Sequence, residues 1–118
     1  MIAEVNWFGW DEALYHAALV NDAARDVVFL MEIRHEAEEG FKCSKSETPS
    51  FVERAVHYLL DNSAIIGRGE PGTISWKIAT EFEGESSTIA KQIVKLWSAD
   101  KESFDCLVFI IRDVKHAV

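Results

Sequence analysis

The chain has few cysteines, and this excludes two classes of small protein. Its 118 residues include only Cys43 and Cys106, which lie too far apart to form a CxxC pair. A domain held together by disulfides, or organised around a structural zinc ion, needs more cysteines at closer spacing. A chain of this length with 48% hydrophobic residues can bury a core without such crosslinks. We therefore expect residues 1–118 to form a single domain.

Long apolar runs and a surplus of basic residues are also absent. No apolar run approaches the roughly 18 residues needed to span a bilayer. The N-terminal residues lack the basic and apolar regions of a secretory signal peptide. A net charge of −8 is opposite to what a protein needs for binding phosphate backbones. We expect a cytoplasmic protein that binds neither membranes nor nucleic acid directly.

Catalytic motifs are missing as well. The chain contains no Walker A sequence, no dinucleotide-binding glycine pattern, no HExxH and no Gly-x-Ser-x-Gly. We expect no cofactor, no resident metal and no enzymatic activity. The alternative is a small enzyme or metal-binding protein whose site carries no motif. Its residues would be His57, which lies between acidic residues at i±4, or a cluster at helical spacing that contains one Glu-x-x-His pair. That cluster consists of Glu32, His35, Glu36 and Glu39.

The periodicity of apolar residues predicts helices and strands in a mixed order. Asp11 can cap a helix after Trp10, Pro49 suits the first turn of a helix over 48–61, and Ser86 or Ser87 can cap a third helix. Strands are expected at 2–8, 73–83 and 106–111, and loops at 40–50 and 67–72. Residues 22–39 favour a helix, with a strand over 27–34 as the alternative. The sum is an α+β domain with N-terminal helices and a C-terminal strand–helix–strand unit, whose spacing allows a parallel crossover.

What the chain does have is acid concentrated at one end. Residues 1–40 hold nine acidic and two basic residues, a net charge of −7, so almost the whole charge lies in the first third. A negative field of this kind steers basic partners and repels polyanions. On a helix over 22–39, five acids surround Phe29 and Ile33, which resembles the charged rim and apolar anchors of a protein-binding surface. The expected partner-binding residues are Asp22, Asp26, Phe29, Glu32, Ile33, Glu36 and Glu39.

The function that these features favour is neutralisation of a basic protein. Small acidic immunity proteins, antitoxins and phage inhibitors share this general character, and their targets are toxins or nucleic-acid-processing enzymes with basic clefts. A DNA mimic would need regularly spaced acids beyond residue 40, which the chain lacks. Self-association, for example into a homodimer, is a further alternative and would use Trp7 and Trp10 or the edge of the sheet. The sequence does not decide whether these tryptophans lie in the core or at an interface.

Overall fold

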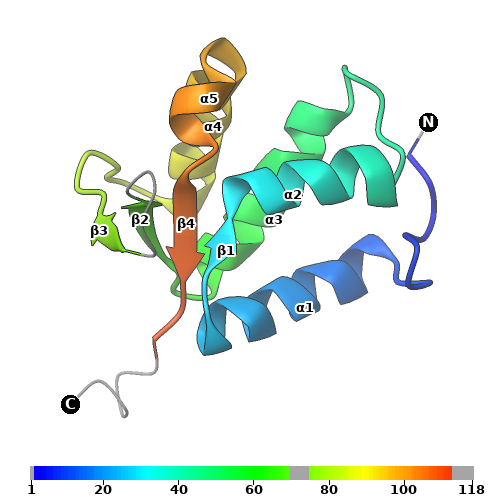
Figure 1. Cartoon of the computed structure of the whole chain (residues 1–118), viewed down its shortest axis with the longest axis horizontal. Helices are drawn as coiled ribbons and strands as arrows, with labels where there is room; N and C mark the ends of the chain where they lie inside the picture. Colours follow the sequence, from blue (N-terminus) through cyan, green and yellow to red (C-terminus); the bar gives the residue numbers. More distant parts are fainter. Residues whose placement is uncertain (1, 70–74, 113–118) are drawn as a thin grey trace.

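The computed structural model describes residues 2–69 and 75–112, which form helices beside a small antiparallel sheet (Figure 1). The α+β prediction is therefore confirmed. The helices are α1 (Glu12–Arg25), α2 (Leu30–His35), the π-helical turn η1 (Glu36–Gly40), α3 (Thr48–Asp61), α4 (Ser86–Ala99) and α5 (Lys101–Phe104). The strands are β1 (Val28–Phe29), β2 (Ile65–Gly69), β3 (Trp76–Ile78) and β4 (Leu107–Ile110).

The three long helices lie where the sequence predicts them. Asp11 caps α1, with its side chain accepting a hydrogen bond from the Leu14 N–H at 2.9 Å. Pro49 lies in the first turn of α3, where its missing N–H costs no hydrogen bond. The predicted serine cap of α4 is wrong, because Glu85 holds the N-cap position and its side chain makes no capping bond.

Residues 22–39 are neither one helix nor one strand. Helix α1 ends at Arg25, the chain extends through β1, and α2 begins at Leu30. The buried Val28 and the half-buried Phe29 pair with Phe109 and Val108 of β4. Both interpretations of the sequence were therefore partly right, since β-branched and aromatic residues form a short strand between two helical segments.

The sheet has the strand order β1-β4-β2-β3, and every neighbouring pair is antiparallel. β3 and β4 flank α4 in the sequence and run in the same direction, but β2 lies between them and pairs with both. The predicted unit thus exists as strand–helix–strand without direct pairing of its two strands.

Strand β2 occupies residues that the sequence assigns in part to a loop. Gly67 leaves room for its neighbours, because a Cβ atom there would lie 2.7 Å from the Trp76 ring and 2.9 Å from the Val108 side chain. The glycines that suggested a loop therefore serve close packing inside a sheet. Of the predicted strand 73–83, only β3 is a strand, residues 73–74 lie outside the described part, and Phe82 is buried in a loop.

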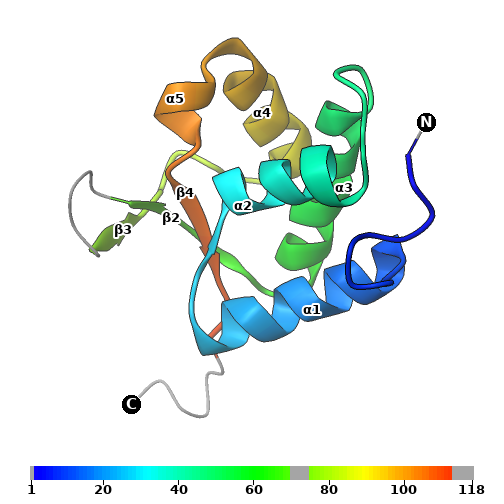
Figure 2. The same ribbon diagram turned by 45° about the vertical axis from the view of Figure 1, so that its right-hand side comes forward.

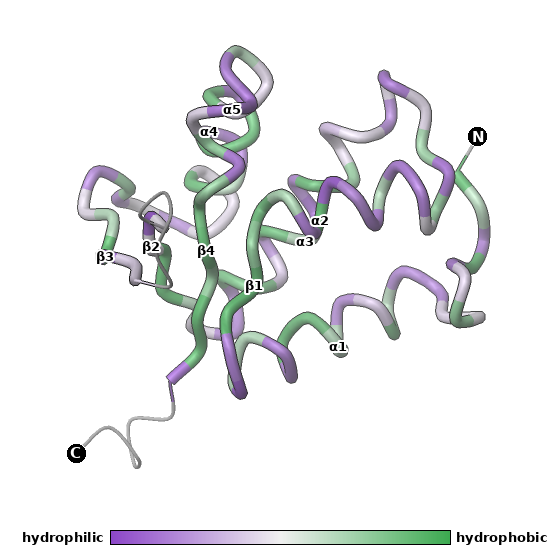
Figure 3. The backbone as a smooth tube through the Cα atoms, viewed as in Figure 1, coloured by the Kyte–Doolittle hydropathy of each residue, from purple (hydrophilic) through white to green (hydrophobic). Residues whose placement is uncertain are grey.

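One connected core unites the helices and the sheet. Helix α3 packs against α1, α2 and α4, and its residues Phe51, Val52 and Leu59 are fully buried. All four residues of β4 are buried, and Figure 3 shows this strand as hydrophobic. Figure 2 shows α1 and α2 side by side, with the N-terminal segment at one end of the pair. That end of the molecule carries the candidate site.

Candidate functional site

The N-terminal segment forms a turn that Asn6 organises, and the predicted strand at 2–8 does not exist. The buried Asn6 side chain accepts hydrogen bonds through Oδ1 from the N–H groups of Phe8 (3.0 Å) and Trp10 (3.1 Å). Its Nδ2 donates to Oε1 of the buried Glu36. Gly9, with φ of +76°, completes the turn. Asn6 therefore fixes the backbone of an aromatic turn, which we define as residues 6–10, against η1.

The aromatic side chains of this turn lie on the surface. Trp7 and Phe8 are 53% and 68% exposed, and Trp10 is 37% exposed. The rings of Phe8 and Trp10 lie 5.1 Å apart between centroids, and Trp7 contacts the ring of His35 at 5.7 Å. Trp7 and Trp10 therefore lie at the surface and not in the core.

A groove of about 760 Å³ lies between the aromatic turn, α1 and α2. Its apolar lining includes Phe8 and Trp10 from the turn, Tyr15, Ala18 and Leu19 from α1, and Met31 from α2. Met31 is about half exposed, and so is Leu14, which precedes Ala18 by one turn of α1. Exposed apolar side chains grouped around a hollow are typical of a binding surface.

The polar lining of the groove is mainly acidic. Its acidic members are Asp22, Glu32, Glu36 and Glu38, and its basic members are Arg34 and His35. A second hollow of about 450 Å³ shares Asp22 and Glu32 and adds Asp26 and Arg25. The predicted group of Asp22, Asp26 and Glu32 therefore exists, although α1 and α2 contribute its members separately across the groove. Together these acids and the exposed apolar side chains form the candidate site.

Three predicted residues of the partner-binding surface, Phe29, Ile33 and Glu39, line neither the groove nor the second hollow, and Phe29 is half buried. Ile33 is fully buried in the core. Glu36 lines the groove, but it is only 9% exposed and accepts a hydrogen bond from Asn6. Glu39 is exposed but does not line the groove, where Glu38 takes its place. The cause is local: the strand β1 interrupts the helix, and the i→i+5 bond from Phe41 N–H to Glu36 O in η1 changes the phase of the residues after Glu36.

Glu32 has no basic partner among the described residues. Within the described residues it forms no ion pair with a lysine, arginine or histidine. Partial burial raises the pKa of its carboxyl group, the N–H of Phe29 lowers this pKa, and Asp22 and Asp26 raise it further. The charged form of Glu32 is therefore less stable here than in water, and a bound cation would stabilise it.

Arg34 is occupied by other carboxylates. Its guanidinium donates to Asp105 at 3.1 Å and lies 4.0 Å from Glu38. Asp105 also accepts a hydrogen bond from the indole N–H of Trp97 at 2.9 Å. Arg34 therefore ties α2 to the segment before β4 and leaves the negative charge of the groove largely uncompensated.

The residues of the alternative enzyme or metal site do not converge. Among residues 2–69 and 75–112, no three histidine, cysteine, aspartate or glutamate side chains lie close enough to hold a metal ion. Glu36 is directed to Asn6, and His35 contacts Trp7. His57 pairs with Asp61 at 3.2 Å on the outer side of α3, as neighbours at i, i+4 do.

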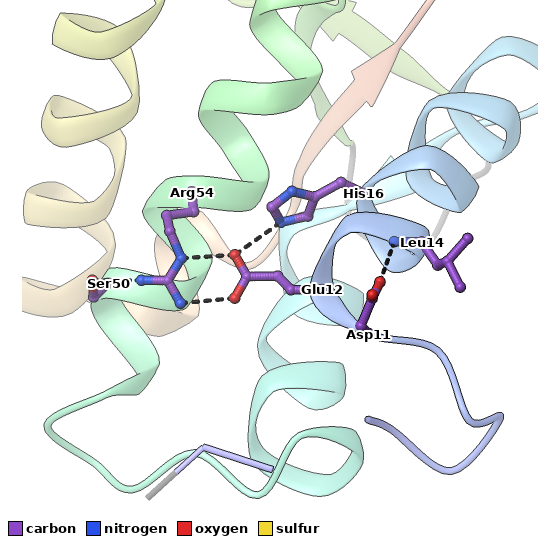
Figure 4. Close-up of polar contacts among 6 residues, drawn as sticks. All are labelled: Asp11, Glu12, Leu14, His16, Ser50 and Arg54. Carbon is purple, nitrogen blue, oxygen red and sulfur yellow. Dashed lines mark hydrogen bonds and ion pairs between the residues drawn. The ribbon is translucent and has the colours of Figure 1, made fainter. Parts of the chain in front are cut away.

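A polar cluster joins α1 to α3 (Figure 4). The guanidinium of Arg54 donates to both carboxylate oxygens of Glu12, at 2.7 and 2.9 Å, and to Ser50 at 2.9 Å. The buried His16 places Nε2 3.5 Å from the same carboxylate, but this nitrogen makes no hydrogen bond. Burial lowers the pKa of His16, Glu12 raises it and Arg54 lowers it. The cluster positions α1, which supplies one wall of the groove.

The chain matches no known family model, no curated protein and no solved structure. In the part of the chain that the structure describes, no helix is both long enough and apolar enough to cross a membrane. Any conclusion about function must therefore come from the groove itself.

Proposed function

We propose that this protein binds a basic protein and neutralises it, in the manner of an immunity protein or a similar inhibitor of a toxin or nucleic-acid-processing enzyme. One observation carries the proposal: exposed aromatic side chains of the turn 6–10 adjoin the acidic groove between α1 and α2. Aromatic anchors beside charged residues are typical of protein interfaces, and the acids select a basic partner.

Two further features support this proposal. The interface residues are held in place before binding, since Asn6 fixes the aromatic turn and the Glu12–Arg54 pair joins α1 to α3. Preorganised surfaces lose less entropy on association and bind more tightly. Cys43 and Cys106 are free thiols, as is usual for proteins of the reducing cytoplasm, and this supports binding of the partner in that compartment.

The test is an affinity capture of partners from the native lysate at low and high salt, with identification by mass spectrometry. We expect one stoichiometric basic protein whose capture weakens with salt. Phe8→Ala with Trp10→Ala should abolish the capture, whereas Ile78→Ala, a matched change of an exposed apolar residue on β3, should leave it intact.

Addition of the purified chain should then suppress the toxic or enzymatic activity of the captured protein. A captured protein that keeps its activity in the complex would contradict the inhibitor role. A stable homodimer that binds no other protein would contradict the proposal as a whole.

A further inference from the structure

Aromatic ring faces and carboxylates converge in the groove. The Phe8 ring is mostly solvent-exposed and lies at an interplanar angle of 33° to Trp10, which leaves aromatic surface free beside the acids. Glu32 and Asp22 line the same groove from α2 and α1. Aromatic faces and carboxylates share one preferred ligand, a cation.

The described part of the chain does not supply a cation to Glu32. Glu32 has no ion pair there, and Asp22 pairs only with Arg25 on the surface, at 3.2 Å. Surface pairs of this kind contribute little free energy and exchange readily. Arg34 is held by Asp105 and Glu38.

The hydroxyl group of Tyr15 is an independent indication of a ligand. Tyr15 is 93% buried, since its exposed fraction is 7%, and it lines the groove. The hydroxyl forms no hydrogen bond to a described residue and is not among the fully buried unpaired atoms, so it is open to the groove. An N–H donor that entered the groove would satisfy this oxygen.

We propose that the groove binds a single arginine side chain of the partner. Its guanidinium stacks on the rings of Phe8 and Trp10, and its N–H groups donate to the carboxylates of Glu32 and Asp22 and to the Tyr15 oxygen. This inference rests on the proposed function and names the group that the groove recognises. A planar guanidinium can stack and donate several hydrogen bonds at once, whereas the ammonium of lysine is a compact point charge, so the site favours arginine.

The test is an NMR titration of the full chain with the blocked tripeptide acetyl-Gly-Arg-Gly-amide. The probes are the indole N–H of Trp10 and the backbone N–H groups of Phe8 and Glu32. The matched ligands carry citrulline, the neutral isostere of arginine, or lysine at the central position. We expect saturable shifts with the arginine peptide and an affinity about tenfold higher than for the citrulline peptide.

Variants locate the binding. Glu32→Gln and Phe8→Leu should each weaken binding of the arginine peptide, whereas Glu102→Gln in α5, an exposed residue that does not line the groove, should not. Absence of saturation, or equal affinity for citrulline, overturns the inference, and equal affinity for lysine overturns the assignment to guanidinium. If capture of a partner requires Phe8 but the arginine peptide does not bind, the proposed function stands and only this inference fails.

Discussion

At the scale of single residues, Asn6 has the widest influence on the site. One buried side chain supplies two hydrogen bonds to the aromatic turn and one to Glu36. Nothing in its sequence context distinguishes it from an ordinary loop asparagine. Its role depends on a contact with a residue thirty positions away, which periodicity cannot reveal.

We predict that Asn6→Ala lowers the free energy of unfolding by about 1–3 kcal/mol, because it leaves Glu36 buried without its donor. Partner capture should also be lost, since the turn loses the bonds that fix Phe8 and Trp10. Urea unfolding and the capture experiment measure the two effects. The control is Asn62→Ala, whose amide donates to the Tyr58 carbonyl at an exposed helix end and should cost less.

His16 gives a second prediction at this scale. Its folded-state pKa is lowered, so below the unfolded value near 6.5 the unfolded chain binds more protons than the folded chain. Stability should therefore fall as the pH decreases from 7 towards 5.5. The groups facing His16 are Glu12 and Arg54, together with the Tyr58 ring at 5.1 Å. Chemical unfolding at several pH values should show a flatter dependence for His16→Gln than for the control His57→Gln.

At the scale of elements, η1 directly follows α2 and holds the aromatic turn through the hydrogen bond between Asn6 and Glu36. A Cβ atom on Gly40 would lie 2.6 Å from Oε1 of Glu36, closer than real Cβ contacts. Glycine at position 40 therefore allows Glu36 to occupy its buried site beside Asn6. The absence of a Cβ atom, and not an unusual backbone angle, is what matters at this position.

We predict that Gly40→Ala destabilises the protein by about 1–3 kcal/mol, because Glu36 must shift from its position. In a Glu36→Ala background the same substitution should cost much less, since the conflicting carboxylate is gone and alanine suits a helix better than glycine. A double-mutant cycle from urea unfolding measures this coupling. Equal costs in both backgrounds would show that Glu36 is not the cause.

The sequence was a good guide to elements whose apolar pattern is uninterrupted. Helices α1, α3 and α4 and strand β4 were predicted because local periodicity and tertiary burial agree in them. The sequence was misleading where contacts between distant residues decide the structure. The glycines of β2 suggested a loop, yet Gly67 packs on Trp76, and the apparent single helix over 22–39 is broken by pairing of β1 with β4.

The sequence predicted only part of the candidate site, because tertiary contacts decide which residues meet there. The acids at 22, 26 and 32 do form one group, but two separate elements bring them together. Phe8, Tyr15 and Met31 line the groove without any signal in their spacing. Conversely, Ile33 fits the pattern of an exposed anchor and is buried, because α3 and the sheet cover α2.

At the scale of the whole molecule, the position of the charge matters more than its total. Residues 1–40 carry a net charge of −7 out of −8, and the groove lies within that part of the chain. Long-range attraction depends on where charges face the approaching partner, and at 0.1 M salt it decays over about 10 Å. If the proposed basic partner binds at the groove, this arrangement would accelerate their encounter.

We predict that Asp22→Lys with Glu32→Lys slows association with the captured basic partner by about tenfold at low salt and weakens the salt dependence of the rate. The matched control is Glu85→Lys with Glu102→Lys, exposed residues beside α4 and in α5. Both double variants change the net charge from −8 to −4, so any difference between them reports position alone. Stopped-flow association rates at several salt concentrations measure the effect, and equal slowing by the two variants would mean that the groove is not where the partner arrives.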